Sequence, residues 1–345
     1  MSQMDRRLFL AAGAAAVVPF AACARDASGD WLPQASLPWP VQEIYCAVLN
    51  GTILTAGGLV SRQGEPLHIE DRVGIYHPGA DRWSEGPRLP APRHHPMVFA
   101  EGGRAFVFGG YGRSEAGDWT SMTEGWTLVD DDWVPTTPLP GPQSEAVGVT
   151  LDGRLHLLTG RAPSGAANGQ WTDHGDVDIH RVYLPAEARW EAARPCPMAR
   201  NSAAAAVLDG AIWVAGGRTV SGGGAGRLDR YDPVADRWDT LAPIPRSQAA
   251  DNQVGGGLAM AAIDGRLVVF GGEWFQRGGG GVFQETWVYS ASDDAWAAGP
   301  DMSTPRHGLA AASIDGTVYA IAGGAVVSGG RAVGTVEAWT PSLFY

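Results

Sequence analysis

Short apolar runs alternate along the chain with two-residue turns of the kind that join antiparallel strands. An Asn-Gly or Asp-Gly turn precedes a run such as residues 267–270, and both turn positions require the positive φ that these residues tolerate. Most of the runs end in a pair of glycines. The pattern therefore predicts a succession of β-hairpins. The turns are Asn50-Gly51, Gly102-Gly103, Asp152-Gly153, Asp209-Gly210, Asp264-Gly265 and Asp315-Gly316.

A tryptophan recurs between these turns at intervals of 48 to 58 residues. An aromatic residue lies seven positions before most of these tryptophans, as Tyr76 does before Trp83. Self-similarity at a period of this size is the signature of a repeat architecture. We therefore expect six copies of one supersecondary unit. The tryptophans are Trp31, Trp83, Trp133, Trp190, Trp238 and Trp296.

The glycine pair, the aromatic residue and the tryptophan together resemble the Kelch repeat over residues 31–345. This resemblance implies an all-β fold, a six-bladed Kelch-type β-propeller with four strands in each blade. The last unit has Trp339 at its aromatic position but then ends, whereas Trp31 has no preceding glycine pair. We therefore expect the N- and C-terminal strands to pair and close a single propeller over residues 24–345, which also covers the edge strands.

Residues 1–23 resemble an export signal of the bacterial twin-arginine type. Arg6-Arg7 is followed by Phe9-Leu10 and by an apolar run over 11–22, which is short for a membrane span. The run ends at Cys23, in a sequence that resembles a lipoprotein cleavage site. We expect export to the periplasm. The sequence leaves open whether a lipid on Cys23 attaches the protein to a membrane or the signal is cleaved elsewhere.

Composition excludes several kinds of chemistry. All 25 basic residues are arginine, so a lysine Schiff base and a Walker A phosphate loop are excluded. The net charge of −12 argues against nucleic acid as a partner. Cys46 and Cys196 are too few for a disulfide scaffold; two inert thiols are favoured, with a single disulfide as the alternative. No metal-binding spacing appears, and no cofactor is expected.

The repeat also selects positions that should surround the mouth of the central channel. Arg93, Arg200 and Arg306 each lie ten residues after a tryptophan. Converging guanidinium groups would suit an anionic ligand such as a carboxylate. The alternative is that these arginines brace neighbouring blades. The next positions add His94, Asn201 and His307, and then Glu43, His95 and Glu145.

The fifth unit is seven residues longer between its tryptophan and its turn than the other units. The extra chain lies within residues 246–257 and contains Gln248, Asp251 and Asn252. Repeat folds often carry specific function in such an insertion, so these side chains are candidate ligand contacts. The alternative is a surface loop without function.

Loops after the glycine pairs carry aromatic residues that the repeat does not require. Trp274 belongs to this group, and aromatic rings beside polar groups suit sugar stacking. Glu273 and Arg277 on the same loop could supply a general base and an anion clamp. Arg161 and Arg218 occupy similar loop positions. The other aromatic residues are Tyr111, Trp119, Trp171 and Phe275.

Three functional hypotheses follow, all for a monomer. The first is a binding module whose loops hold a carbohydrate or a sugar acid. The second rests on a resemblance to exported six-bladed sialic acid mutarotases, which carry a Gly-Glu…Arg loop; it implies that Glu273 is an acid/base and that Arg277 holds a carboxylate. The third is a scaffold in a protein complex of the cell envelope.

Overall fold

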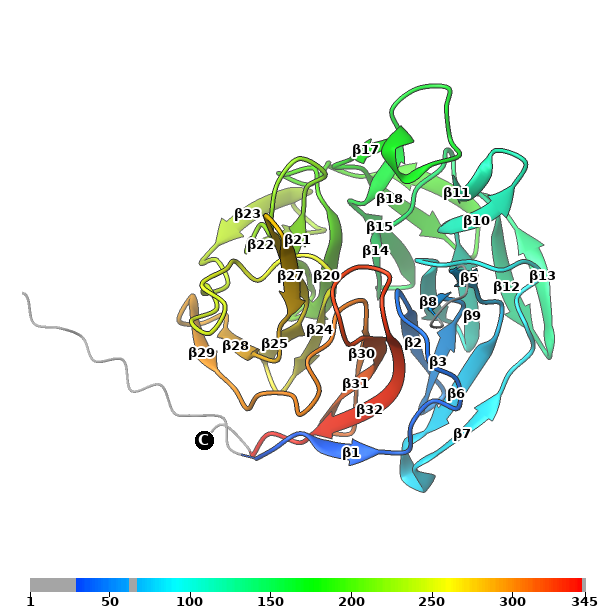
Figure 1. Ribbon diagram of the computed structural model, residues 1–345. Coiled ribbons are helices and arrows are strands. Elements are labelled where there is room, and N and C mark those ends of the chain that lie inside the picture. Colours follow the sequence, from blue (N-terminus) through cyan, green and yellow to red (C-terminus); the bar gives the residue numbers. More distant parts are fainter. Residues whose placement is uncertain (1–28, 62–66, 343–345) are drawn as a thin grey trace, which may run out of the picture.

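The computed structural model describes residues 29–61 and 67–342. Within these residues, six four-stranded antiparallel sheets surround a central axis (Figure 1). This arrangement confirms the all-β, six-bladed propeller. The predicted signal at residues 1–23, with Cys23, lies outside the described residues, so export and lipidation stay predictions.

The first strands of neighbouring blades contact one another around the axis, and the later strands lie outside them (Figure 1). Blade 1 consists of β2 (Tyr45–Leu49), β3 (Thr52–Ala56), β6 (Val73–His77) and β7 (Arg82–Glu85). Blade 2 consists of β8 (Met97–Glu101), β9 (Arg104–Phe108), β12 (Gly125–Val129) and β13 (Asp132–Thr136). Blade 3 consists of β14 (Val147–Leu151), β15 (Arg154–Leu158), β18 (His180–Leu184) and β19 (Arg189–Ala192).

The second half of the ring repeats this order. Blade 4 consists of β20 (Asn201–Leu208), β21 (Ala211–Arg218), β22 (Leu228–Asp232) and β23 (Arg237–Leu241). Blade 5 consists of β24 (Leu258–Ile263), β25 (Arg266–Gly271), β28 (Thr286–Ser290) and β29 (Ala295–Ala298). Blade 6 consists of β30 (Ala310–Ile314), β31 (Thr317–Gly324), β32 (Ala332–Trp339) and β1 (Leu32–Gln34).

Four small hairpins extend the loops that follow the glycine pairs, and we call the face that carries them the loop face. The two 3-10 helices are η1 (Pro78–Ala80) and η2 (Trp171–Asp173). In the described part of the chain, no helix has the length and hydrophobicity to cross a membrane. The hairpins are β4 (Leu59–Val60) with β5 (His68–Ile69), β10 (Tyr111–Ser114) with β11 (Gly117–Ser121), β16 (Arg161–Pro163) with β17 (His174–Asp176), and β26 (Glu273–Gln276) with β27 (Gly279–Val282).

The predicted closure of the ring is confirmed. Leu32 pairs with Ala338 and Gln34 with Val336, so β1 completes the blade whose other strands are C-terminal (Figure 1). Trp31, directly before β1, donates its indole N–H toward the Thr286 hydroxyl and the Pro300 carbonyl, each at 3.1 Å. The two ends of the chain are thus held to each other and to blade 5.

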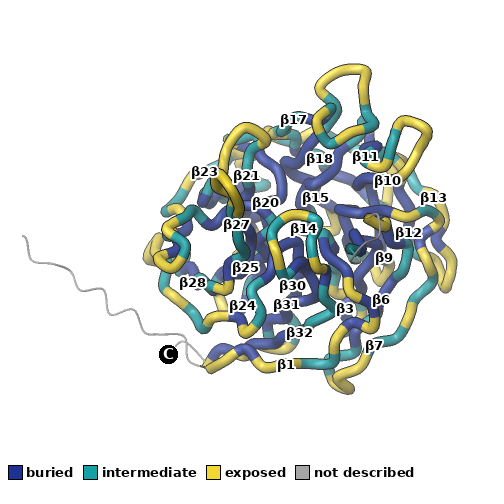
Figure 2. Tube along the Cα trace, viewed as in Figure 1, coloured by how far each residue is buried: buried dark blue, intermediate teal, exposed yellow. Residues whose placement is uncertain are grey.

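The repeated tryptophans tie each blade to the one before it. Every one of the six donates its indole N–H to a backbone carbonyl in the segment that leads out of the preceding blade, at 2.8 to 3.2 Å. Buried apolar strands fill the space between blades, and the exposed segments lie at the periphery (Figure 2). The tryptophans therefore belong to the core between blades. The acceptors are the carbonyls of Ala35, Pro87, Thr137, Arg194, Ala242 and Pro300.

The glycine pairs allow neighbouring blades to approach closely beside the axis. A Cβ atom on Gly57 would lie 2.3 Å from the Arg93 carbonyl oxygen of the next blade. The second glycine of the pair, Gly58, donates its N–H to the same carbonyl at 2.8 Å. Equivalent bonds occur at all six blade junctions. In the sixth unit, Gly323 takes the position of the second glycine and Ala322 that of the first. The donors of the six bonds are Gly58, Gly110, Gly160, Gly217, Gly272 and Gly323.

Blade 3 departs from this pattern with a buried histidine pair. His156 fills a strand position that is apolar in the other five units, and its Nδ1 lies 2.9 Å from His180 Nε2. His180 Nδ1 faces the Arg194 carbonyl at 3.2 Å, so Nδ1 carries the hydrogen and Nε2 accepts from His156. Burial lowers the pKa of His156 to about 3 and that of His180 to about 4. Both rings are therefore neutral in the folded protein.

Cys46 and Cys196 are both free thiols, as the cysteine count favoured. Burial raises the pKa of each thiol to about 12. Because the thiolate is the reactive form, both side chains are chemically inert at neutral pH.

The closure predicts a large stability loss for Trp31→Ala. Trp31 packs 4.9 Å from Phe270 and 6.0 Å from Trp339, measured between ring centroids, and is almost fully buried. Removing the ring should cost about 3–5 kcal/mol of unfolding free energy, measured by urea denaturation. Leu32→Ala at the next position, where the side chain is 60% exposed, should cost less than about 0.5 kcal/mol. Equal losses would mean that the Trp31 side chain contributes no more to stability than an exposed side chain of β1.

The histidine pair predicts a stability that falls in acid. In the unfolded chain both groups titrate near pH 6.5, whereas in the fold they resist protonation until about pH 3–4. Stability is therefore complete above pH 6.5 and decreases as the pH falls below it, by on the order of 4 kcal/mol between pH 7 and pH 5. The His156→Leu/His180→Val variant should lose less stability than the parent between pH 7 and pH 5 in urea titrations. His68→Gln, at an exposed histidine, should behave like the parent.

Candidate functional site

Six equivalent residues, one from each blade, form a backbone ring around the axis at the loop face. Each lies at the start of the innermost strand of its blade or within two residues of it, and has a φ between 47° and 68°. Hydrogen bonds link four of the six neighbouring pairs, for example from Ser202 N to the Glu145 carbonyl at 3.0 Å and from Gly257 N to the Ser202 carbonyl at 2.9 Å. The members of this backbone ring are Glu43, His95, Glu145, Ser202, Gly257 and Gly308.

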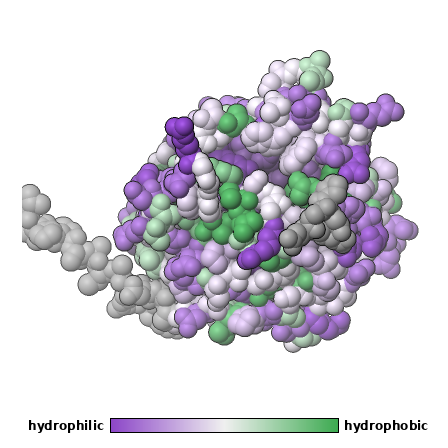
Figure 3. Space-filling view, viewed as in Figure 1, coloured by the Kyte–Doolittle hydropathy of each residue, from purple (hydrophilic) through white to green (hydrophobic). Residues whose placement is uncertain are grey.

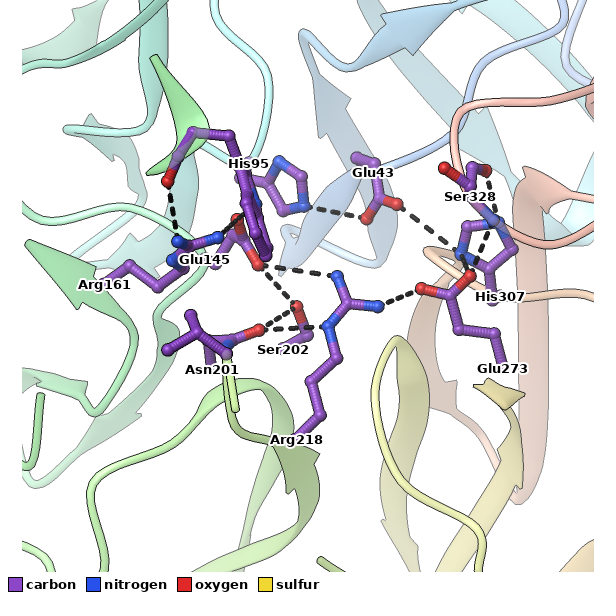
Figure 4. Close-up of polar contacts among 12 residues, drawn as sticks. Glu43, His95, Glu145, Arg161, Asn201, Ser202, Arg218, Glu273, His307 and Ser328 are labelled. Atoms are coloured by element: carbon purple, nitrogen blue, oxygen red, sulfur yellow. Dashed lines mark hydrogen bonds and ion pairs between the residues drawn. The ribbon is translucent and has the colours of Figure 1, made fainter. Parts of the chain in front are cut away.

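The left-handed backbone at these positions suits glycine, which blades 5 and 6 provide. Glu43, His95 and Glu145 adopt the same conformation at a cost of about 1–2 kcal/mol each. Residues held in such conformations tend to cluster at functional sites. Ser202 is the fourth non-glycine member of the backbone ring, and Glu43, His95 and Glu145 direct charged or titratable side chains toward the centre of the loop face (Figure 4).

These three side chains belong to a set of six, one from each blade, which we call the charged ring (Figure 4). Arg218 and Glu273 join it from the positions directly after the glycine pairs of blades 4 and 5. His307 joins it from the position directly before the backbone ring in blade 6. All six are largely buried. In order of blade, the charged ring consists of Glu43, His95, Glu145, Arg218, Glu273 and His307.

Arg218 connects the carboxylates on its two sides. Its Nη1 donates to Glu273 Oε1, its Nη2 lies 3.6 Å from Glu145 Oε2, and its Nε lies 3.2 Å from Asn201 Oδ1. Burial alone would lower the pKa of Arg218, but the surrounding carboxylates raise it above its usual value. The pKa of Glu145 is lowered although burial opposes this, because His95, Arg218 and Arg161 favour its ionised form. Both groups are therefore charged at neutral pH.

His95 forms the second charged pair. Its Nε2 lies 2.9 Å from Glu43 Oε2, and its Nδ1 lies 2.9 Å from His94 Nδ1. Burial would lower the pKa of His95, but Glu43 raises it above its usual value, whereas burial and the His95 charge hold the pKa of His94 well below. His95 is consequently protonated on both nitrogens: Nδ1 donates to neutral His94, and the Nε2 side of the ring forms an ion pair with Glu43. The site thus holds a protonated imidazole beside a carboxylate.

Backbone carbonyl groups determine which nitrogen of His307 carries a hydrogen. Its Nε2 lies 3.0 Å from the carbonyl oxygens of Val326 and Ser328, which can only accept, so Nε2 carries a hydrogen. Its Nδ1 lies 3.5 Å from Glu43 Oε1 and 3.6 Å from Glu273 Oε2. An unprotonated Nδ1 would direct its lone pair toward two carboxylates. The His307 ring therefore lies between the carboxylates of blades 1 and 5.

Five members of the charged ring, all except His307, form the floor of a cavity of about 470 Å³ that opens on the loop face. Trp119 and Trp171 line it from blades 2 and 3. Trp171 donates its indole N–H to Glu145 Oε1 at 3.1 Å, and its ring lies 3.6 Å from the Arg161 guanidinium carbon. Val220 and Phe275 line the opposite side, from blades 4 and 5. The cavity thus combines a polar floor with apolar walls.

The three arginines expected at the channel mouth do not line this cavity. Each is buried and paired with a carboxylate in or next to the third strand of its own blade. Arg93 pairs with Glu124 at 3.3 Å and lies over Trp126, and the other two pairs are closer. The arrangement fits the alternative of structural bracing, although within a blade. These other pairs join Arg200 to Asp229 at 2.9 Å and Arg306 to Glu337 at 2.5 Å.

The inserted loop of the fifth unit does not reach the cavity, contrary to the prediction from the sequence. The backbone hydrogen bonds to blade 4 are made by Gly255 and Gly257, at the positions where counting along the repeat predicted Gln248 and Ala250. The difference arises because the seven extra residues of the fifth unit precede these positions. Gln248 and Asp251 are exposed and do not line the cavity. Asn252 and Trp274 line a small hollow beside it.

The other predicted residues divide into those inside the site and those outside. His94 and Asn201 contact the charged ring, and His307 is a member of it, as described above. Glu273 is also a member, and its cationic partner is Arg218. Arg277 lies exposed at the tip of the β26–β27 hairpin, away from the cavity lining. Of the expected general base and anion clamp, only Glu273 therefore lines the cavity.

Sequence reasoning placed Glu43, His95 and Glu145 near the channel mouth but did not select them, and it noted Arg218 only as a loop arginine. A signal was present in the alignment of the units. Two units have glycine at the backbone-ring position once the insertion is counted, and this marks a left-handed backbone. Charged residues at such a position stand out against that requirement. In the described residues, no group of His, Cys, Asp or Glu side chains is arranged to hold a metal ion.

Comparison with known proteins agrees with the fold. Residues 199–245 match the Kelch motif. The chain is 25% identical to Kelch-like protein terF of Aspergillus terreus, over 91% of this chain and 69% of that protein. It is 25% identical to beta-scruin of Limulus polyphemus and 30% identical to human Kelch-like protein 33, covering 79% and 51% of this chain. It spans only 29% and 32% of the lengths of these two proteins.

A solved structure titled "Structure of YjhT" superposes with a TM-score of 0.72 at 16% sequence identity, over 88% of this chain and 95% of that one. This similarity shows a shared fold. Together with the six repeats, these matches identify the chain as a Kelch-repeat β-propeller.

The charged ring predicts that Arg218→Gln destabilises the fold most strongly near neutral pH. Without the guanidinium, Glu145 and Glu273 remain buried with less compensation, which should cost about 3–5 kcal/mol at pH 7. The pKa of Glu145 should rise, so its protonation in acid should relieve part of this cost. Urea denaturation at pH 7 and pH 4.5 should therefore give a smaller difference from the parent at pH 4.5.

The exposed pair of Arg113 with Asp118 supplies the control for this prediction. Arg113→Gln should change stability by less than about 0.5 kcal/mol at either pH. An Arg218→Gln loss of the same size at both pH values would show that packing, not charge, is what Arg218 contributes.

Proposed function

We propose that this propeller binds a carbohydrate in the loop-face cavity. The observation that carries the proposal is the cavity itself, whose floor holds carboxylate, guanidinium and imidazole groups and whose wall holds two indole rings. Carboxylates and charged donors form strong hydrogen bonds with hydroxyl groups, and aromatic faces pack against sugar rings. A volume of about 470 Å³ lies within the range of small-molecule sites.

The charges favour a neutral carbohydrate over a sugar acid. Arg218 lines the cavity, but it already faces Glu145 and Glu273. A carboxylate on the ligand would therefore meet three glutamates and only two cations, Arg218 and protonated His95, which already face those glutamates. The hydroxyl groups of a neutral sugar can donate to those same glutamates. Arg277, the expected anion clamp, is outside the cavity lining.

Mutarotation of the bound sugar is the second candidate, and the protonation states of the site support it. The reaction needs one group that protonates the ring oxygen and one that accepts the proton of the anomeric hydroxyl. His95, which holds a proton, and Glu273 both line the cavity. In this proposal His95 is the acid and Glu273 is the base.

The third hypothesis, a scaffold in an envelope complex, fits this face less well. A scaffold surface would be broad and flat, whereas the loop face is hollowed at its centre (Figure 3).

From the sequence we also propose that the protein is a periplasmic monomer and that a lipid on Cys23 anchors it.

Two NMR experiments test the proposed function. Saturation transfer from the purified protein to methyl glycosides of glucose, galactose, mannose and xylose should reveal at least one ligand, and N-acetylneuraminate should give a weaker signal. The approach of freshly dissolved free sugars to anomeric equilibrium then tests for catalysis. Absence of binding to every neutral sugar would make the proposed function wrong.

Glu273→Gln and Arg277→Gln separate binding from catalysis. If the protein is a mutarotase, Glu273→Gln should slow anomer exchange by about 10²–10⁴-fold, because the base is lost, while leaving detectable binding. Arg277→Gln should match the parent in both measurements, since this side chain lies outside the cavity lining. Unchanged exchange in Glu273→Gln would exclude Glu273 as the base.

A further inference from the structure

The cavity wall on the side of blades 4 and 5 exposes apolar surface that the sugar site does not require. Phe275 is 50% exposed and Val220 is 42% exposed, and both line the cavity. Large exposed apolar side chains that gather at one cavity mark a contact surface, whereas scattered ones carry no meaning. Figure 3 shows apolar side chains, in green, near the centre of the visible face.

Both side chains are held in place by ordered backbone. Phe275 lies in β26, where its partner across the hairpin is Gly280, so the neighbouring strand supplies no side chain to cover the ring. A side chain at Gly280 would collide with the Trp274 carbonyl, since its Cβ would lie 2.4 Å from that oxygen. The backbone N–H of Val220 donates to Asp176 Oδ2 at 2.8 Å, which fastens the loop after β21 to blade 3.

The cavity therefore has two chemically different regions. One consists of the charged ring with Trp119 and Trp171, which suits a hydroxyl-rich ring. The other is formed by Phe275 and Val220, and an aliphatic side chain such as Val220 offers a sugar neither a hydrogen bond nor an aromatic face. The Arg218 guanidinium lies between the two regions, with its carbon 5.8 Å from the centre of the Phe275 ring. A ligand that fills both must itself have a polar and an apolar part.

We propose that the natural ligand is a glycoside with an apolar aglycone, an aryl or alkyl group linked to the sugar. The sugar lies on the charged ring beside the two indole rings, and the aglycone covers Phe275 and Val220. This inference rests on the proposed carbohydrate binding, because it assigns the sugar to the charged ring; it does not extend to mutarotation, because a glycoside has no free anomeric hydroxyl. It adds the class of ligand and a specificity role for Val220 and Phe275.

Matched pairs of probes test the inference in the full-length protein. Methyl and phenyl β-glycosides of glucose, galactose, mannose and xylose differ only in the aglycone, and isothermal titration calorimetry gives the affinity of each. For the sugar that binds, the phenyl glycoside should bind about tenfold more tightly than the methyl glycoside, because its ring removes apolar surface from water.

Val220→Thr and Phe275→Ser probe the wall itself. Each should reduce the phenyl-to-methyl affinity ratio, and the double variant should bring it to about one to two. Both side chains are substantially exposed, so neither change threatens the fold. Val234→Ser is the control, since Val234 is 97% exposed in the turn after β22 and does not line this cavity; it should preserve the ratio.

The outcomes distinguish the two proposals. Equal affinity for methyl and phenyl glycosides would overturn the apolar aglycone while leaving carbohydrate binding intact. A high ratio that survives in the double variant would overturn the assignment to Val220 and Phe275. Failure of every glycoside, methyl and phenyl alike, would overturn the proposed function and with it this inference.

Discussion

The backbone ring is the constraint on which the rest of the structure depends. Six segments from separate blades turn toward the axis in a left-handed conformation, and hydrogen bonds such as Ser202 N to the Glu145 carbonyl join them. The glycine pairs let the blades come close enough for this to happen. Once the ring exists, the side chains of Glu43, His95 and Glu145 must meet at the centre, whatever their distance along the chain.

The convergence of these side chains places three carboxylates close together, and neighbouring cationic side chains compensate their charge. Glu43, Glu145 and Glu273 are three buried carboxylates, and a buried charge is costly unless it is paired. Arg218 and protonated His95 supply the compensation. The result is a floor of fixed charges whose hydrogen bonds are oriented before any ligand arrives. Preorganisation of this kind lowers the cost of binding a polar ligand.

Blades 4 and 5 show how the same framework accepts variation. Seven additional residues lengthen the connection into blade 5, yet Gly257 takes the backbone-ring position that counting along the repeat assigns to Ala250. Hydrogen bonds to both neighbouring blades select the position, and the surplus chain loops out with Gln248 and Asp251 exposed. Loops on this face can therefore change length and composition without disturbing the ring, and Val220 and Phe275 lie on two of them.

The sequence by itself determined the propeller, because each signal for it is local. Turn residues, a glycine pair and a tryptophan within some 50 residues specify one blade, and six copies with an incomplete last unit specify the closure through Trp31. The site could be predicted only in part. Glu43, His95, Glu145 and Arg218 come from four blades, and a charged residue does not by itself indicate a left-handed backbone. Only the tertiary structure decided that Arg218, not Arg277, pairs with Glu273, because convergence at the axis, not proximity in the chain, brings these charges together.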